Sequence, residues 1–91
     1  MFIVLAYDIR DEKRLRRVAK EMENWGLRVQ KSVFECNVNE KELQRLKKRL
    51  LRLIDQSQDS IRIYFLCASC RPRTECLGVG EYHDEEDIIV V

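Results

Sequence analysis

Hydrophobic positions along this 91-residue chain follow strand and helix spacings in turn. Residues 2–7 form a continuous apolar run, which is typical of a central strand covered on both faces. Residues 12–25 then predict a helix, with Asp11 as its N-cap and Gly26 at the position of a C-cap glycine. The apolar stripe that defines this helix consists of Leu15, Val18, Ala19, Met22 and Trp25.

The next segment, Leu27–Cys36, is rich in Val and Phe and is predicted to be extended. Its pattern weakens at residues 30–32, where a kink or a tight reversal is possible, although no Asn-Gly or Asp-Gly pair marks a hairpin. The segment is therefore either one long strand or two short ones.

A second helix is announced by Asn39 as N-cap and Glu42 three residues later, the spacing of a capping box. Val38 and Leu43 occupy the two positions of a hydrophobic staple. The buried stripe is predicted to contain Leu43, Leu46, Leu50, Leu53 and Ile54.

Beyond the second helix the pattern returns to strand spacing. After a polar connection at residues 55–60, the alternation at residues 61–65 predicts a strand. The stretch Ala68–Gly80 contains one Pro and two Gly and is predicted to be a loop. The apolar residues 88–91 are predicted to form a short tail strand that pairs with a sheet edge.

This order of elements predicts a single α+β domain over residues 1–91. If the extended segment folds back on itself, the topology is βαββαβ, a ferredoxin-like layer of two helices on an antiparallel sheet, with one extra C-terminal strand. The edge that receives the tail belongs either to the same chain or to a second subunit. Because a chain this short buries little surface, its core is marginal and a partner subunit would help to stabilise it.

The composition, 45% hydrophobic and 36% charged, excludes a disordered or collagen-like chain. No apolar run approaches the roughly 18 residues of a membrane span, so no membrane association is expected. The N-terminus enters a strand without a basic lead, so no signal peptide is predicted. We expect a cytoplasmic protein whose four cysteines are reduced.

The net charge of +1 conceals a basic first half. Residues 1–52 contain 14 Lys and Arg against 8 Asp and Glu, whereas residues 53–91 contain 3 against 8. Arginine makes up 11 of the 17 basic residues, which favours bidentate contacts with phosphates. This asymmetry indicates one positive face that binds nucleic acid; the alternative is a helix surface that is basic only for solubility.

Asp8 directly follows the first strand and precedes the arginine-rich helix. A strand-end carboxylate can hold a divalent cation while neighbouring arginines hold a polyanion, which indicates metal-assisted chemistry on phosphates. The alternative is that Asp8 caps a turn. Tyr7 and Phe34 are supporting candidates, although both are equally at home in the core. The candidate phosphate ligands are Arg14, Arg16, Arg17, Arg28 and Lys31.

The cysteines offer a weaker alternative, a zinc-stabilised interaction module. Four residues with zinc-binding side chains follow one another: Cys67, Cys70, Cys76 and His83. Their spacing is irregular and contains only one Cys-x-x-Cys pair, so ordinary thiols on a loop are favoured.

Four segments together resemble one family. They are the opening strand 4–9 with its Tyr-Asp pair, the stretch Gly26–Cys36, the strand at residues 59–64, and the acidic residues before the apolar tail. This chain resembles the small CRISPR-associated endoribonucleases, the Cas-two family of spacer acquisition. The resemblance covers nearly the whole chain, and its most specific part is the Arg-Val-Gln-x-Ser-Val-Phe-Glu-Cys run.

The resemblance implies a homodimer whose C-terminal strand crosses to the partner's sheet. It also implies that two copies of Asp8 face each other and hold Mg²⁺ or Mn²⁺ between them. Some family members are described as metal-dependent endonucleases that act on single-stranded RNA or double-stranded DNA. Other members act as non-catalytic scaffolds that bridge two dimers of the CRISPR integrase (the Cas-one family) on duplex DNA during spacer integration.

The family's functional positions carry over residue by residue. Its first-helix arginine falls on Arg17, the arginine before Val-Gln on Arg28, and the aromatic residue of Val-Phe-Glu on Phe34. One further basic position falls on Leu15, with Arg14 and Arg16 on either side. Nothing in these residues chooses between RNA and DNA.

Overall fold

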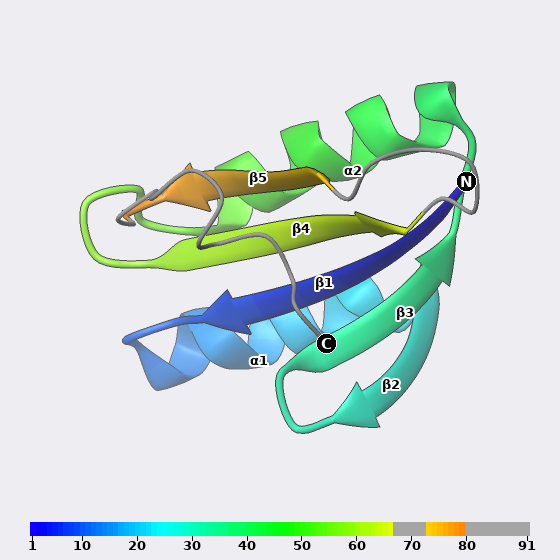
Figure 1. The fold of residues 1–91 in the computed structure, drawn as a ribbon. Coiled ribbons are helices and arrows are strands. Elements are labelled where there is room, and N and C mark those ends of the chain that lie inside the picture. Colours follow the sequence, from blue (N-terminus) through cyan, green and yellow to red (C-terminus); the bar gives the residue numbers. More distant parts are fainter. Residues whose placement is uncertain (67–72, 80–91) are drawn as a thin grey trace.

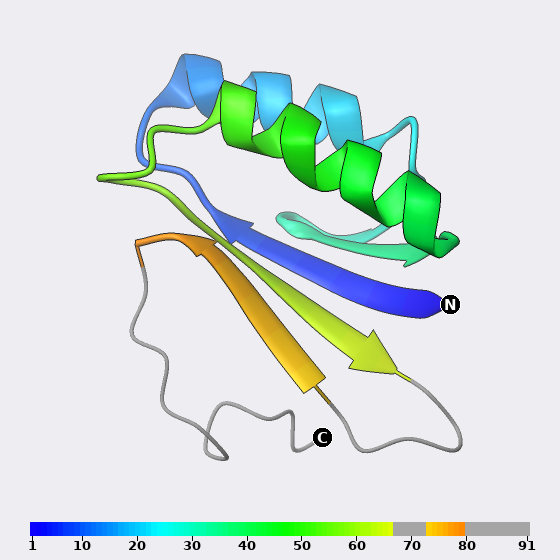
Figure 2. The ribbon, with the colours of Figure 1, turned by 90° about the horizontal axis from the view of Figure 1, so that it is seen from above.

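The computed structural model describes residues 1–66 and 73–79, in which two helices cover one face of a five-stranded antiparallel sheet (Figures 1 and 2). The strand order is β2-β3-β1-β4-β5, and its first four strands have the ferredoxin-like arrangement. The predicted α+β fold is therefore confirmed. In chain order the elements are β1 (Phe2–Asp8), α1 (Glu12–Met22), β2 (Gly26–Gln30), β3 (Val33–Asn37), α2 (Glu40–Leu53), β4 (Ser60–Leu66) and β5 (Arg73–Gly78).

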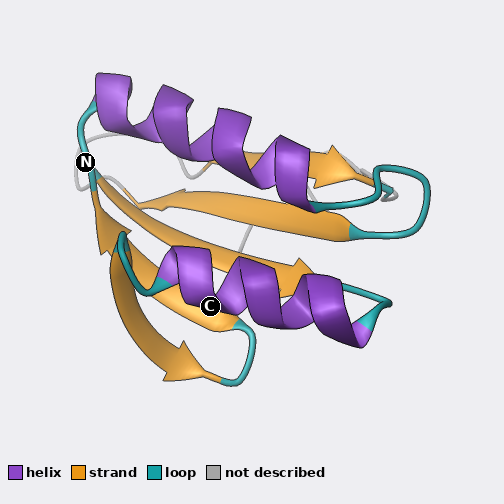
Figure 3. Cartoon of the chain, turned by 180° about the vertical axis from the view of Figure 1, so that it is seen from behind, coloured by secondary structure: helices purple, strands orange, loops and turns teal. Residues whose placement is uncertain are grey.

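The two faces of the sheet differ because β-strand side chains alternate. On β1, Ile3, Leu5 and Tyr7 are buried beneath the helices, whereas Val4 and Ala6 are only half-buried on the opposite face. Figure 3, the view from behind, shows that α1 and α2 cover the same face of the sheet. No helix in residues 1–66 or 73–79 combines the length and apolar character that crossing a membrane requires.

The extended segment is two strands, which settles the alternative left open by the sequence. β2 and β3 are antiparallel and reverse at Lys31–Ser32, with an irregular register between Arg28 and Gln30. This reversal lies at the polar residues where the strand pattern weakened.

Both predicted helix starts are confirmed. The Asp11 carboxylate accepts a hydrogen bond from the Arg14 backbone N–H at 3.0 Å. At the second helix, the Glu42 N–H donates to the Asn39 side chain at 2.7 Å, and the Asn39 N–H donates to the Glu42 carboxylate at 2.9 Å. Each N-terminus thus satisfies backbone donors that have no partner within the helix.

The predicted end of the first helix is wrong. α1 ends at Met22, and Gly26 is the first residue of β2 without the left-handed φ of a C-cap glycine. A Cβ at Gly26 would meet the carbonyl oxygen of Glu35 and lie 2.6 Å from the sulfur of Cys36. The glycine is therefore required by the close approach of β2 to β3, not by the helix end.

The loop predicted for 68–80 is wrong over Arg73–Gly78, which is β5 and pairs with β4 from Phe65↔Arg73 to Ser60↔Gly78. This strand is short and mostly polar, with Pro and Gly close to its two ends, so its composition imitates a loop. The predicted tail strand 88–91, and therefore the question of whose sheet it joins, lies outside the described residues.

Candidate functional site

Asp8 is the last residue of β1 and is exposed. It pairs in register with Ser60 of β4, and the alternation along β1 places it with Val4 and Ala6 on the sheet face that carries no helix. The carboxylate predicted to bind metal is thus accessible, and it lies at the end of a central strand.

A cleft of about 390 Å³ opens beside Asp8, between α1 and the β2–β3 turn. Three of the predicted phosphate ligands, Arg16, Arg28 and Lys31, line this cleft together with Asp8 and Tyr7. They come from three separate elements, so the fold gathers them. The remaining lining residues are Ile9, Leu15, Ala19 and Ser32.

Arg28 and Tyr7 are held in place by Phe34. The guanidinium carbon of Arg28 lies 5.4 Å from the centre of the Phe34 ring, within the range of a cation–π interaction. The Tyr7 and Phe34 rings stack with their centres 6.2 Å apart. Because Phe34 is fully buried, it cannot stack on a nucleobase in this arrangement; it supports two residues that line the cleft.

Tyr7 also fixes the β2–β3 turn through its backbone. Its N–H donates to the carbonyl of Ser32 at 3.1 Å, and its hydroxyl lies 3.5 Å from the carbonyl oxygen of Lys31. These contacts hold the turn that contributes Lys31 and Ser32 to the lining of the cleft.

Arg14 and Arg17 do not line the cleft. Arg17 is exposed on α1, whereas the guanidinium of Arg14 donates to the buried carboxylate of Asp59, with Nε 2.7 Å from Oδ2 and Nη2 3.2 Å from Oδ1. An arginine bound in this way has a structural task within the chain.

Asp59 is a central residue of the site region that the sequence did not single out for a role. Its fully buried carboxylate also accepts the backbone N–H of Arg10 at 2.9 Å and that of Asp55 at 2.8 Å. Burial alone would raise the pKa of Asp59, but the hydrogen bonds from Arg14 and from these two N–H groups outweigh it and lower the pKa to about 2. The charged carboxylate therefore ties the chain just after Asp8 to the start of β4.

Among the described residues of one chain, Asp8 is the only carboxylate that lines the cleft. Across residues 1–66 and 73–79, no cluster of three or more His, Cys, Asp and Glu side chains is placed to hold a metal ion. An oxygen ligand suits Mg²⁺, which keeps several waters and is bound by one or two carboxylates plus substrate phosphates. The donor set fits such a metal if a second Asp8 and a phosphate complete it.

Of the four residues in the zinc alternative, only Cys76 lies in the described part of the chain, where it is a half-buried residue of β5. The positions of Cys67, Cys70 and His83 lie outside the described residues. The zinc module therefore stays a prediction.

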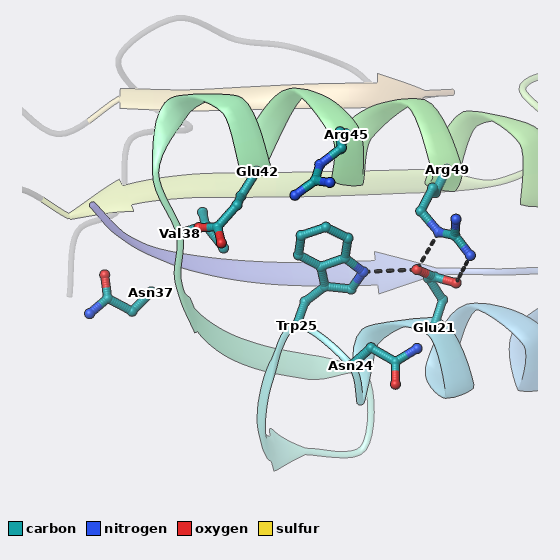
Figure 4. Close-up of a pocket in the computed structure, with 8 residues that line it drawn as sticks. All are labelled: Glu21, Asn24, Trp25, Asn37, Val38, Glu42, Arg45 and Arg49. Atoms are coloured by element: carbon teal, nitrogen blue, oxygen red, sulfur yellow. Dashed lines mark hydrogen bonds and ion pairs between the residues drawn. The ribbon is translucent and has the colours of Figure 1, made fainter.

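A larger cavity, of about 510 Å³, lies between the C-terminal end of α1 and α2 and contains none of the predicted site residues (Figure 4). Its Glu21 carboxylate accepts from the indole N–H of Trp25 at 2.8 Å and from Nε of Arg49 at 2.6 Å. The hydrogen bond from Arg49 lowers the pKa of Glu21. This network joins the two helices and has no group aimed at a reaction.

Comparison with known proteins identifies relatives over most of the chain. The family model described as CRISPR associated protein Cas2 matches residues 1–74. A protein of Moorella thermoacetica named CRISPR-associated endoribonuclease Cas2 1 is 52% identical over an alignment of 85 positions that covers 88% of each chain. A protein of Halalkalibacterium halodurans named CRISPR-associated endonuclease Cas2 is 41% identical over an alignment of 95 positions that covers 99% of each chain.

Solved structures agree with these matches. The crystal structure of Streptococcus pyogenes Cas2 at pH 6.5 superposes with a TM-score of 0.70 at 44% identity, over 76% of this chain and 89% of that one. The crystal structure of a Thermus thermophilus protein described as hypothetical, TT1823, has a TM-score of 0.72 at 41% identity, over 89% and 94% of the two chains.

Proposed function

Because this chain belongs to the Cas2 family of CRISPR-associated proteins, we propose that it is a Mg²⁺- or Mn²⁺-dependent endonuclease of CRISPR adaptation, built around Asp8. The observation that carries this proposal is the exposed Asp8 carboxylate at the end of β1, beside a cleft lined by Arg16, Arg28 and Lys31. The acid would bind the metal, and the three cations would bind the phosphates on either side of the cleaved bond.

The proposal includes a homodimer, because Asp8 is the one carboxylate that lines the cleft in residues 1–66 and 73–79. The helix-free face of the sheet supports this pairing. Phe2 on β1 and Leu66 on β4 are paired neighbours there and remain about 40% exposed, with relative exposures of 41% and 39%. A second copy packed on this face would cover such apolar surface and bring a second Asp8 to the same side of the sheet.

Within this site each side chain has a defined task. Arg28 is oriented by the Phe34 ring, so its guanidinium is positioned for a phosphate before substrate binds. Arg16 and Lys31 add positive charge to the lining of the cleft. The two Asp8 carboxylates would hold the cation, which would polarise a phosphoryl oxygen and lower the pKa of a bound water. The water oxygen forms the new bond to phosphorus, the bond from phosphorus to the 3′ or 5′ sugar oxygen breaks, and the proton lost by the water passes through solvent to that departing oxygen.

A second function, a scaffold that bridges integrase dimers on duplex DNA, is favoured by a different observation. Four exposed cations follow one another at helical spacing along α2, away from the cleft, and none forms an ion pair with another residue in 1–66 or 73–79. Such a row binds a phosphate backbone without reading its sequence. The four are Lys41, Arg45, Lys48 and Arg52.

The two functions are separated by Asp8→Ala and by the double variant Arg17→Ala/Arg28→Ala. Mg²⁺-dependent cleavage of single-stranded RNA and of duplex DNA is measured for each, and spacer integration is measured separately with the integrase present. A control, Glu12→Ala, removes an exposed acid of α1 that does not line the cleft.

The enzymatic proposal expects that Asp8→Ala loses cleavage while Glu12→Ala keeps it. Full cleavage by Asp8→Ala contradicts this proposal. Integration by Asp8→Ala at the unaltered rate, with cleavage absent, supports the scaffold. If the arginine variant keeps both its duplex affinity and its salt dependence, Arg17 and Arg28 do not bind phosphates.

A further inference from the structure

The cleft beside Asp8 has a chemical character that phosphate binding does not explain. Four of its lining residues are apolar or aromatic, namely the half-buried Leu15 and Ala19 of α1 and the buried Ile9 and Tyr7. The cations Arg16, Arg28 and Lys31 line the same cleft. A phosphate chain needs the cations only, because apolar surface makes no favourable contact with a phosphate.

The combination of apolar and cationic side chains in one lining matches one nucleotide better than a bare phosphate. A volume of about 390 Å³ falls in the lower part of the range of about 300–1,000 Å³ that is usual for pockets holding small organic groups. A nucleobase has flat apolar faces that suit Leu15 and Ala19, and polar edges that suit the hydroxyl of Ser32.

We propose that the cleft between α1 and the β2–β3 turn receives an unpaired nucleobase, while the cations around it bind the adjoining phosphates. The inference rests on the proposed function, since it assumes that this cleft faces nucleic acid. It extends that function by assigning a base-binding site beside Asp8, which a single strand or an unpaired end or loop can fill.

The preference for a single strand follows from the location of the apolar surface. A base in a duplex is stacked on its neighbours and paired through its edge, so it must leave the helix before it can enter a pocket. A base in a single strand has no such constraint. The cleft therefore favours single strands, whereas the α2 cations treat single and double strands alike.

Ala19→Leu tests the proposal because it fills the cleft without changing charge. Leucine and alanine are both strong helix formers, so α1 should be kept. Gln44→Leu is the matched control, since it places the same side chain at an exposed, uncharged position of α2 that does not line the cleft. Circular dichroism and thermal melting of both variants establish that they fold.

Binding is measured by fluorescence anisotropy with EDTA present, so that no strand is cut. The probes are a 12-nucleotide oligothymidylate, a 12-residue strand of the same phosphate number in which every position is abasic, and a 12-base-pair duplex. The unaltered protein should bind the oligothymidylate about tenfold more tightly than the abasic strand. Ala19→Leu should remove that difference and leave duplex binding unchanged, and Gln44→Leu should change neither.

Equal affinity of the unaltered protein for the base-bearing and abasic strands overturns the proposal, and this arm needs no variant to fold. Retention of the tenfold difference in Ala19→Leu overturns it as well. Because metal is absent, loss of the nuclease activity proposed for Asp8 would not affect these results. If the protein binds in a base-dependent way but cleaves no strand in the presence of metal, the proposed enzymatic function is contradicted. The proposed base-binding site would still be supported.

Discussion

Arg14 on α1 and Asp59 before β4 form a bidentate ion pair across 45 residues of sequence, with Nε 2.7 Å from Oδ2. The carboxylate is fully buried and the arginine side chain is 23% exposed, so the pair is partly shielded from water. The Asp59 carboxylate also accepts a hydrogen bond from the backbone N–H of Arg10, two residues after Asp8. The ion pair therefore helps to hold the segment that follows Asp8.

Arg14→Ala should lower the free energy of unfolding clearly, because it removes two hydrogen bonds from the buried charge of Asp59. Arg17→Ala, one turn away on the exposed surface of α1, should change it by less than about 0.5 kcal/mol. Urea unfolding followed by circular dichroism measures both. Similar values for the two variants would contradict the structural role of Arg14.

The low pKa of Asp59 predicts acid sensitivity. Because its folded pKa, about 2, lies below the unfolded value near 3.8, the carboxylate stabilises the fold fully above about pH 4. This stabilisation should be lost as the pH falls from about 4 through 2. In Asp59→Asn the same loss should be absent over that window, although the variant starts from lower stability. Unfolding free energies measured at several pH values between 5 and 2 test the difference in slope.

Val4→Lys should separate the proposed dimer without unfolding the chain. Val4 lies on the helix-free face opposite Glu35 of β3, so the new ammonium group gains a cross-strand partner within one chain. The same charge would be buried unfavourably against a second copy. Light scattering after gel filtration should show monomers, with cleavage lost in parallel. Gln44→Lys on α2 is the control and should remain dimeric; a dimeric Val4→Lys would place the interface elsewhere.

Arg28 should contribute more than charge to single-strand binding. Arg28→Ala is expected to weaken binding and to reduce the slope of log affinity against log salt by about 0.7. Arg28→Lys should restore the salt slope but only part of the affinity, because an ammonium group lacks the planar fork that lies over Phe34. Titrations at four salt concentrations test this, and full restoration by lysine would contradict it.

Gly26→Ala should destabilise the sheet, because its methyl group would overlap the Glu35 carbonyl and crowd the Cys36 sulfur. The expected loss is about 1–3 kcal/mol. Ala6→Gly, which removes a methyl from a strand, is a comparison in which no overlap arises. Unchanged stability of Gly26→Ala would show that β2 can move away from β3 at no cost.

Local patterns predicted much of this fold because each depends on neighbours in sequence. The caps Asp11 and Asn39 bond to backbone groups three residues away, so their spacing alone identifies them. Gly26 shows the limit of such reasoning. A glycine after an apolar helix has the same local signature whether it ends the helix or allows another strand to approach.

The site was predictable in part for the same reason. Asp8 stands at the end of a recognisable strand and Arg28 lies within another, but the burial of Asp59 depends on Arg14, 45 residues away. In sequence Asp59 is one acid in a polar connection and cannot be distinguished from Asp55. Likewise, Leu15 and Ala19 belong to an ordinary apolar stripe in the sequence. They line a cleft because the β2–β3 turn lies opposite them in the fold.

The described residues that line the cleft all fall within residues 7–32, and Asp59, from the second half of the chain, anchors the segment that follows Asp8. The residues that line the cleft and the residues that support it thus occupy consecutive parts of one short sequence. Chimeras that exchange the block after residue 39 between relatives should inherit the substrate choice of the N-terminal donor, provided that the acid at position 59 is kept.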